Sequence, residues 1–203
     1  MLRACKVPVL LLAFLAGGCS TSPDIYLLAK YGKDIGVSGF EVCKNYGCKA
    51  RVHVAFNDGE WGRVREIFAG APASAAAERE QIREAVALME RIVGPKAGTA
   101  GDGPGAPIIN IDTEGQLDCI DEACNTTTYL RLIASEGLLR WHDVGDPHQR
   151  GDFINGWPHN TATVIERETK TAYTIDSWFH ANGEMPEVVL LSEWLSGWSP
   201  PEA

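Results

Sequence analysis

Three residues in the second half of the chain, Cys119, His159 and Asp176, are of the types that form a nucleophilic cysteine site. Asp118 can cap a helix, so we expect Cys119 in the first turn of a helix. A thiolate there lies near unpaired N–H groups and the positive end of the helix dipole, which lower its pKa and can stabilise an oxyanion. The negative charges of the acidic side chains around Cys119 instead raise the pKa of its thiol. The cysteine therefore needs a cationic partner, most simply a histidine.

His159 and Asp176 lie in two stretches that are typical of neighbouring strands. HNTATVIE begins with the histidine, and TAYTIDSW carries the aspartate near its end. A hairpin closed by a two-residue turn at 168–169 would place Asp176 opposite Thr161, diagonal to His159 on the same face. A shift by two residues would place the pair directly opposite, whereas a slip by one residue would separate them. In either of the first two registers Asp176 lies within reach of His159, where it could orient the imidazole as the aspartate does in acyl transfer.

The helix around Cys119 resembles a known nucleophile helix. DCIDEACNTTTYLRLIASEGLL is similar to that of bacterial transglutaminase-like cysteine proteinases, in the transglutaminase-like branch of the papain-fold superfamily. In the family motif a small residue precedes the cysteine, an acidic residue follows two positions later, and an alanine two after that. The last two positions match Asp121 and Ala123, whereas Asp118 departs from the family's setting before the cysteine.

The resemblance continues into both strands and covers residues 115–178. WPHNTATV matches the histidine strand at His159, and YTIDSW matches the aspartate strand at Asp176. It implies an α+β fold with a papain-like or transglutaminase-like core, in which the nucleophile helix packs on a small antiparallel sheet. It also implies cleavage or transfer of a peptide or protein amide through a Cys119 thioester, without a cofactor. Gln116 is the candidate oxyanion donor, although papain-like enzymes place their glutamine further upstream.

A second function stays open, because this fold also hosts proteins that only bind. The protein would then be a non-catalytic binding or scaffolding lipoprotein that contacts envelope proteins or peptidoglycan. The formal net charge is −9 and there is no basic run, which argues against nucleic acid as a partner.

The first residues indicate the compartment. Basic residues precede an apolar run of about ten residues, which is too short to span a bilayer but typical of a signal peptide. LAGGC resembles a bacterial lipobox, so residues 1–18 would be removed and Cys19 lipidated. An ordinary signal peptide, with Cys19 incidental, is the alternative. We expect a lipid-anchored protein on the periplasmic side of the envelope, with the outer membrane favoured over the inner membrane. Residues 19–40 would form a tether, and residues 41–203 a single domain.

The remaining cysteines have simpler interpretations. Cys43 and Cys48 flank the tight turn CKNYGC, and an oxidising compartment favours a disulfide between them. Cys124 lies on an apolar helix stripe and is expected to be buried. A four-thiolate zinc site with Cys119 is disfavoured, since five residues along a helix separate two thiols by about 140°.

The run HDVGDPH offers an alternative site for a divalent ion, but polar residues are expected in a loop anyway, so no metal is expected. The pattern as a whole predicts helices at 61–68, 74–93, 119–136 and 191–198, and strands at 49–56, 138–144, 159–166 and 171–178. Gly94 and Pro95 are expected to end the second helix and to begin a loop or mobile flap.

Overall fold

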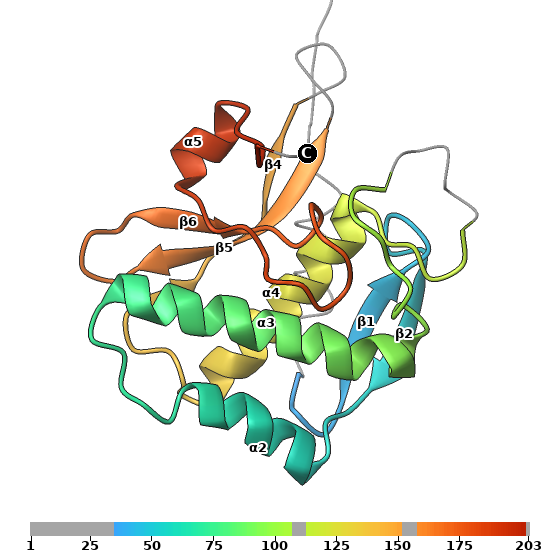
Figure 1. The fold of residues 1–203 in the computed structure, drawn as a ribbon, viewed down its shortest axis with the longest axis horizontal. Helices are drawn as coiled ribbons and strands as arrows, with labels where there is room; N and C mark the ends of the chain where they lie inside the picture. The colour runs from blue at the N-terminus through green and yellow to red at the C-terminus, as the bar shows by residue number, and fades with distance from the viewer. Residues whose placement is uncertain (1–34, 107–112, 152–157, 202–203) are drawn as a thin grey trace, which may run out of the picture.

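The computed structural model of the chain describes residues 35–106, 113–151 and 158–201 (Figure 1). The expected signal peptide, Cys19 and most of the expected tether lie outside these residues. Within the described ranges, no helix has both the length and the apolar character needed to cross a membrane. The fold is α+β, as expected, with small antiparallel sheets and four helices in the described part.

The first sheet is a hairpin of β1 (Phe40–Lys44) and β2 (Ala50–Val54). The sequence predicts β2 but not β1. The first residue of β1, Phe40, is the last residue of the expected tether. Ile35 and Val37, just before β1, pack against the core, so residues 35–39 take part in the folded structure.

The second sheet is built around β5 (His159–Glu166), the strand that carries the histidine. Its partners are β3 (His142–Val144), β4 (His148–Arg150) and β6 (Ala172–Ile175), all antiparallel to it. β3 is shorter than the predicted strand at 138–144, and β4 is not predicted. At the histidine end of β5, His159 pairs with Arg150 of β4, which fixes the backbone there.

The β5–β6 hairpin has the first of the two predicted registers. Ala162 pairs with Ile175, which places Asp176 next along the chain, in register with Thr161 and diagonal to His159. The turn is longer than predicted. The N–H of Lys170 donates to the carbonyl of Glu166 at 2.9 Å.

That bond closes a turn of four residues, 167–170, instead of the predicted two-residue turn at 168–169. Lys170 has a positive φ of 57°, which lets the chain reverse there.

Four helices accompany the sheets: α2 (Asp58–Ile67), α3 (Ala75–Ala97), α4 (Cys119–Ser135) and α5 (Leu191–Leu195). α4 lies between the two sheets, with α3 crossing it (Figure 1), and it contacts both β5 and β1. The predicted apolar stripe of α4 is therefore only part of its buried surface. Polar side chains on its other faces are buried as well, namely Asp121, Glu122, Asn125 and Thr126.

The prediction that Gly94 and Pro95 end α3 is wrong. The helix continues through both and ends at Gly98, which has a φ of 76° and caps the helix in the left-handed conformation. A Cβ at Gly94 would lie 2.9 Å from Asn182 Nδ2, so only glycine allows the helix end to pack this closely. The described part of the expected flap is also packed, since Thr99 and Asp102 are buried. Residues 107–112 lie outside the described residues.

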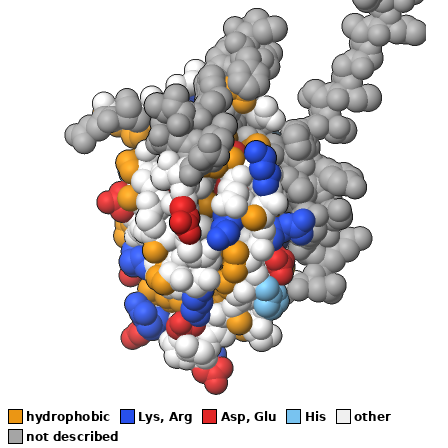
Figure 2. All heavy atoms as spheres, turned by 90° about the vertical axis from the view of Figure 1, so that its right-hand side faces the viewer, with side chains coloured by type: hydrophobic (Ala, Val, Ile, Leu, Met, Phe, Trp, Pro, Cys, Tyr) orange, Lys and Arg blue, Asp and Glu red, His pale blue; other side chains and the backbone are white. Residues whose placement is uncertain are grey.

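The surface is mixed in charge. On the face shown in Figure 2, acidic and basic side chains of the described residues are interspersed instead of being gathered by sign. Several charged groups near the site are instead buried, namely Glu90, Asp102 and Glu122.

Candidate active site

The N-terminus of α4 has the capping geometry that the sequence predicts. Asp118 Oδ1 accepts hydrogen bonds from the N–H groups of Ile120 and Asp121, at 3.1 and 2.8 Å. Asp121 in turn accepts a bond from the N–H of Asp118, which completes a capping box. Cys119 is the first residue of the helix and is partly exposed. Its position in the first turn is therefore the predicted one.

A disulfide loop holds this first turn. Cys43 and Cys48 form the predicted disulfide. The N–H groups of Tyr46 and Cys48 donate to the two carboxylate oxygens of Asp121, both at 2.7 Å. Both carboxylate oxygens of Asp121 are thereby fixed by the loop that the disulfide closes.

The backbone of this loop is strained. Residues 45–48 all have positive φ, between 56° and 68°, although only Gly47 lacks a side chain. Such conformations cost free energy and persist where the surroundings hold them. Here they turn successive N–H groups toward the helix, including that of Gly47 toward Asp118 at 2.8 Å. Asn125 adds a bridge to both backbone groups of Cys43.

Cys124 is a buried thiol that packs against the disulfide, as expected for a packing residue. The sulfurs of Cys43 and Cys48 lie near the Asp121 carboxylate, close enough to share an ion. The disulfide bond uses both sulfurs, however, and Cys119 contacts a different residue. These cysteines therefore do not form the four-thiolate arrangement considered from the sequence.

The predicted contact between His159 and Asp176 is present. His159 Nε2 and Asp176 Oδ2 are 2.8 Å apart, and both side chains are buried. An ionised carboxylate only accepts hydrogen bonds, so Nε2 carries the proton and Nδ1 of the neutral ring is unprotonated. Nδ1 is buried and has no hydrogen-bond partner among the described residues. The ring therefore has the orientation and tautomer of a base that is held by an aspartate.

Aromatic rings surround this pair. The ring centroids of Trp178, Phe179 and Trp194 lie 4.6, 5.3 and 5.4 Å from that of His159. Trp194 is fully buried, and its indole N–H donates to the same oxygen of Asp176 at 2.8 Å. Apolar surroundings strengthen hydrogen bonds by excluding water. This role of Trp194, which lies on the short helix α5, is not predicted from the sequence.

The sulfur of Cys119 accepts a hydrogen bond from Asn160 Nδ2 at 3.6 Å. Burial raises the pKa of Cys119 to about 11, although the bond from Asn160 acts in the opposite direction. The negative charge of Asp118 raises this pKa further. The helix N-terminus therefore does not produce a thiolate by itself. In this structure the thiol of Cys119 and Nδ1 of His159 are not hydrogen-bonded to each other.

Gln116, the candidate oxyanion donor, is engaged elsewhere. Its side-chain N–H groups donate to Asp102 Oδ1 and to the carbonyl of Gly103, and its Oε1 accepts from the N–H of Gly103. Asp102 also accepts the N–H of Leu117 at 2.7 Å. Gln116 thus fastens the segment that leads into Cys119.

Three carboxyl groups are buried behind this segment, which the sequence does not predict. Glu122 on α4 hydrogen-bonds to Asp102, and Glu90 on α3 accepts the N–H of Gly183 at 2.9 Å. Burial raises the pKa of Glu90 to about 7 and that of Asp102 to about 6, and it raises the pKa of Glu122 well above the ordinary range. These groups join the chain before Cys119 to the chain after Asp176.

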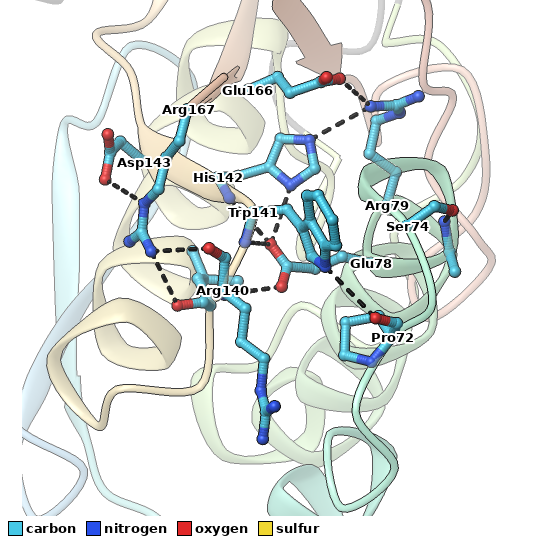
Figure 3. Close-up of polar contacts among 12 residues, drawn as sticks. Pro72, Ser74, Glu78, Arg79, Arg140, Trp141, His142, Asp143, Glu166 and Arg167 are labelled. Atoms are coloured by element: carbon cyan, nitrogen blue, oxygen red, sulfur yellow. Dashed lines mark hydrogen bonds and ion pairs between the residues drawn. The ribbon is translucent and has the colours of Figure 1, made fainter. Parts of the chain in front are cut away.

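The alternative metal run HDVGDPH is divided between the interior and the surface (Figure 3). His142 is fully buried; its Nδ1 lies 2.9 Å from Glu78 Oε1, and its Nε2 lies 3.3 Å from Arg79. Asp143 instead pairs with Arg167 at the surface.

Glu78 also accepts three backbone N–H groups of residues 140–142. Burial alone would raise the pKa of Glu78, but these bonds and the one from His142 hold it below its ordinary value. The cluster therefore anchors α3 to the start of β3 and leaves His142 no free nitrogen for a metal.

No protein family model, curated protein or solved structure matches this chain. Its chemistry is therefore inferred from the geometry of its own residues.

Proposed function

We propose that this protein is a cysteine hydrolase or acyltransferase that acts on amide bonds through Cys119, His159 and Asp176. The observation that supports this most directly is the buried hydrogen bond between His159 and Asp176. It leaves an unprotonated nitrogen on the residue next to Asn160, which contacts the sulfur. Together with the helix position of Cys119, this matches the roles of nucleophile, base and orienting carboxylate.

The resting thiol must lose its proton before it can attack. With a pKa of about 11, Cys119 is protonated near neutral pH, so the reaction begins with transfer of the sulfur's proton to His159 Nδ1. This requires the S–H group to approach Nδ1, while the sulfur still accepts the N–H of Asn160. Catalytic hydrogen bonds often tighten in this way only when substrate is bound.

The thiolate then attacks the amide carbonyl carbon, and the carbonyl's π electrons move onto oxygen. Collapse of this intermediate breaks the C–N bond, and the amine leaves with the proton from His159, which produces a thioester on Cys119. Water or an amine next gives a proton to His159 and attacks the thioester carbonyl. The C–S bond then breaks, the acid or new amide leaves, and the sulfur takes the proton back from His159, which restores the thiol. Water as acceptor makes the protein a peptidase or amidase, and an amine makes it a transglutaminase-like enzyme.

We further propose that the fold is papain-like, in the transglutaminase-like branch. In support, the helix that begins at Cys119 packs on the strand of His159, and the next strand leads to Asp176. The oxyanion role of Gln116 stays a prediction, but the bonds of its amide favour a different donor.

We propose that the protein is a lipoprotein anchored through Cys19 on the periplasmic side of the envelope. The Cys43–Cys48 disulfide supports an oxidising compartment. Expressed in a Gram-negative host, the full chain should fractionate with membranes, and Cys19→Ser should release it. A soluble wild-type protein would contradict the lipid anchor.

Trapping the thioester tests the proposed chemistry. The full chain is incubated with a peptide library, and Cys119 is examined by mass spectrometry for an acyl adduct that neutral hydroxylamine removes. We expect the adduct in wild type and its loss in Cys119→Ala. The alternative, a non-catalytic binding or scaffolding protein, is favoured by the raised pKa of Cys119, and it would bind peptides equally in both forms without any adduct.

A further inference from the structure

Asn160 has a bonding pattern at the site that the fold alone does not explain. It is the second residue of β5, pairs with Gln149 of β4, and is buried. Its Nδ2 donates to the sulfur of Cys119, while its Oδ1 is buried with no hydrogen-bond partner among the described residues. A buried polar atom without a partner destabilises the fold, so such atoms in folded proteins call for an explanation, of which a catalytic role is one.

A buried asparagine of the same fold provides the contrast. Asn125 uses both ends of its amide, since Oδ1 accepts the N–H of Cys43 at 2.7 Å and Nδ2 donates to its carbonyl at 3.0 Å. That is the bonding of a structural residue. Asn160 instead directs its donor to the reactive sulfur and leaves its acceptor unpaired.

We infer that Asn160 is a catalytic residue of this site, whose side-chain amide holds the Cys119 sulfur and stabilises its thiolate. This inference rests on the proposed role of Cys119 as nucleophile. Gln116, the oxyanion candidate from the sequence, does not make this contact, because its own N–H groups are engaged with Asp102 and Gly103.

The Asn160 donor opposes the groups that raise the pKa of the Cys119 thiol. Burial and the charge of Asp118 both raise the pKa of Cys119, and the side chain and backbone N–H of Asn160 are the groups that lower it. Hydrogen bonds to a charged acceptor are stronger than bonds between neutral groups. The contact therefore gains strength when the sulfur becomes a thiolate, which is the change that the reaction requires.

The test measures alkylation of Cys119 in a His159→Ala background, so that its outcome does not depend on the base. The full chain is treated with iodoacetamide at about pH 9, and modification of Cys119 is read by peptide mass spectrometry, which separates it from Cys124. Below the thiol's pKa the rate follows the thiolate fraction, so a rise of about one pKa unit slows alkylation about tenfold. We expect that decrease for Asn160→Leu, and a larger one for Asn160→Asp, which adds a negative charge.

Two further variants exclude simpler causes. Asn160→Ala opens the site, so slow alkylation there cannot come from blocked access. Gln149→Leu makes the same amide-to-leucine change at the exposed cross-strand partner and should leave the rate unchanged.

Thermal unfolding separates the catalytic role from a structural one. Because leucine removes the unpaired Oδ1, the Tm of Asn160→Leu should not fall. Wild-type alkylation in both Asn160→Leu and Asn160→Ala would overturn the inference, and so would a large loss of Tm with an unchanged rate. Neither result would bear on whether His159 acts as the base, which is tested separately.

Discussion

The backbone N–H of Cys48 donates a 2.7 Å hydrogen bond to the carboxylate of Asp121, which joins the disulfide loop to the first turn of the helix that carries Cys119. The loop is strained and its N–H groups converge on this turn, so the disulfide maintains a conformation that the chain alone does not favour. The position of the nucleophile on α4 therefore depends on a disulfide in the β1–β2 hairpin.

Removing the disulfide should loosen that turn. For Cys43→Ala with Cys48→Ala, closure of so short a loop accounts for about 2 kcal/mol of unfolding free energy. We expect a loss of this size in denaturant titrations and faster hydrogen exchange at residues 119–122. Cys119→Ala is the control, which removes a sulfur without touching the loop. Unchanged exchange at 119–122 would mean that the loop does not hold the helix end.

Trp194 should affect the reactivity of Cys119 although it does not touch the sulfur. Trp194→Phe keeps an aromatic ring against His159 but removes the N–H that donates to Asp176. A bond to a charged group contributes about 1.5–3 kcal/mol, so His159-dependent alkylation of Cys119 should slow at least about tenfold. Trp198→Phe, on the same terminal segment, should alkylate like wild type. Equal alkylation rates in the two variants would show that the Trp194 N–H does not affect the reactivity of Cys119.

The buried Glu78 should matter far more to stability than the surface pair beside it. Glu78→Ala leaves His142 and three backbone N–H groups without their acceptor, which should cost about 3–5 kcal/mol of unfolding free energy. Asp143→Ala breaks the exposed pair with Arg167 and should cost at most about 1 kcal/mol. Denaturant titration of both variants gives the comparison. Similar losses in the two would show that the Glu78 cluster is not an anchor.

The buried carboxyl groups predict a stability that falls as the pH rises. A carboxyl whose pKa is higher in the folded chain stabilises the fold below its unfolded pKa, and this contribution is lost as the pH passes the folded pKa. Burial raises the pKa of Glu90 and Asp121 to about 7 and that of Asp102 to about 6. We therefore expect the Tm to drop by about 5 °C or more from about pH 5 to about pH 8.

Glu122→Gln tests the cause of this trend, because it replaces one buried carboxyl with a neutral group of the same shape. It should flatten the dependence of Tm on pH, whereas Glu66→Gln at the surface should not. A Tm that is constant from about pH 5 to about pH 8 in the wild type would contradict the raised pKa values.

Much of the site follows from local sequence patterns. Asp118 before an apolar-periodic stretch predicts the start of α4, and the β-branched residues around His159 and before Asp176 predict the two strands. The observed register is one of the two that the sequence left open. CKNYGC predicts the disulfide because its ends are close along the chain. Each of these signals depends on residues within a short segment.

The parts that the sequence does not predict depend on packing between distant segments. Helix α3 passes Pro95, and Gly94 before it packs closely against Asn182, a contact between residues far apart in the chain. Likewise, Glu122 is buried because α4 lies between two sheets, whereas acidic residues are ordinarily exposed. Trp194 and Asn160 are identified only once α5 and β5 are placed beside Asp176 and Cys119.

The central claim is that His159 acts as the base for Cys119, and the rate of Cys119 alkylation by iodoacetamide at about pH 7.5 tests it most directly. At this pH the thiol is protonated, so rapid alkylation needs a base to take the proton. We predict that His159→Ala slows alkylation about a hundredfold or more, while His53→Ala, an exposed histidine on β2, has no effect. Equal rates in wild type and His159→Ala would contradict the proposed mechanism.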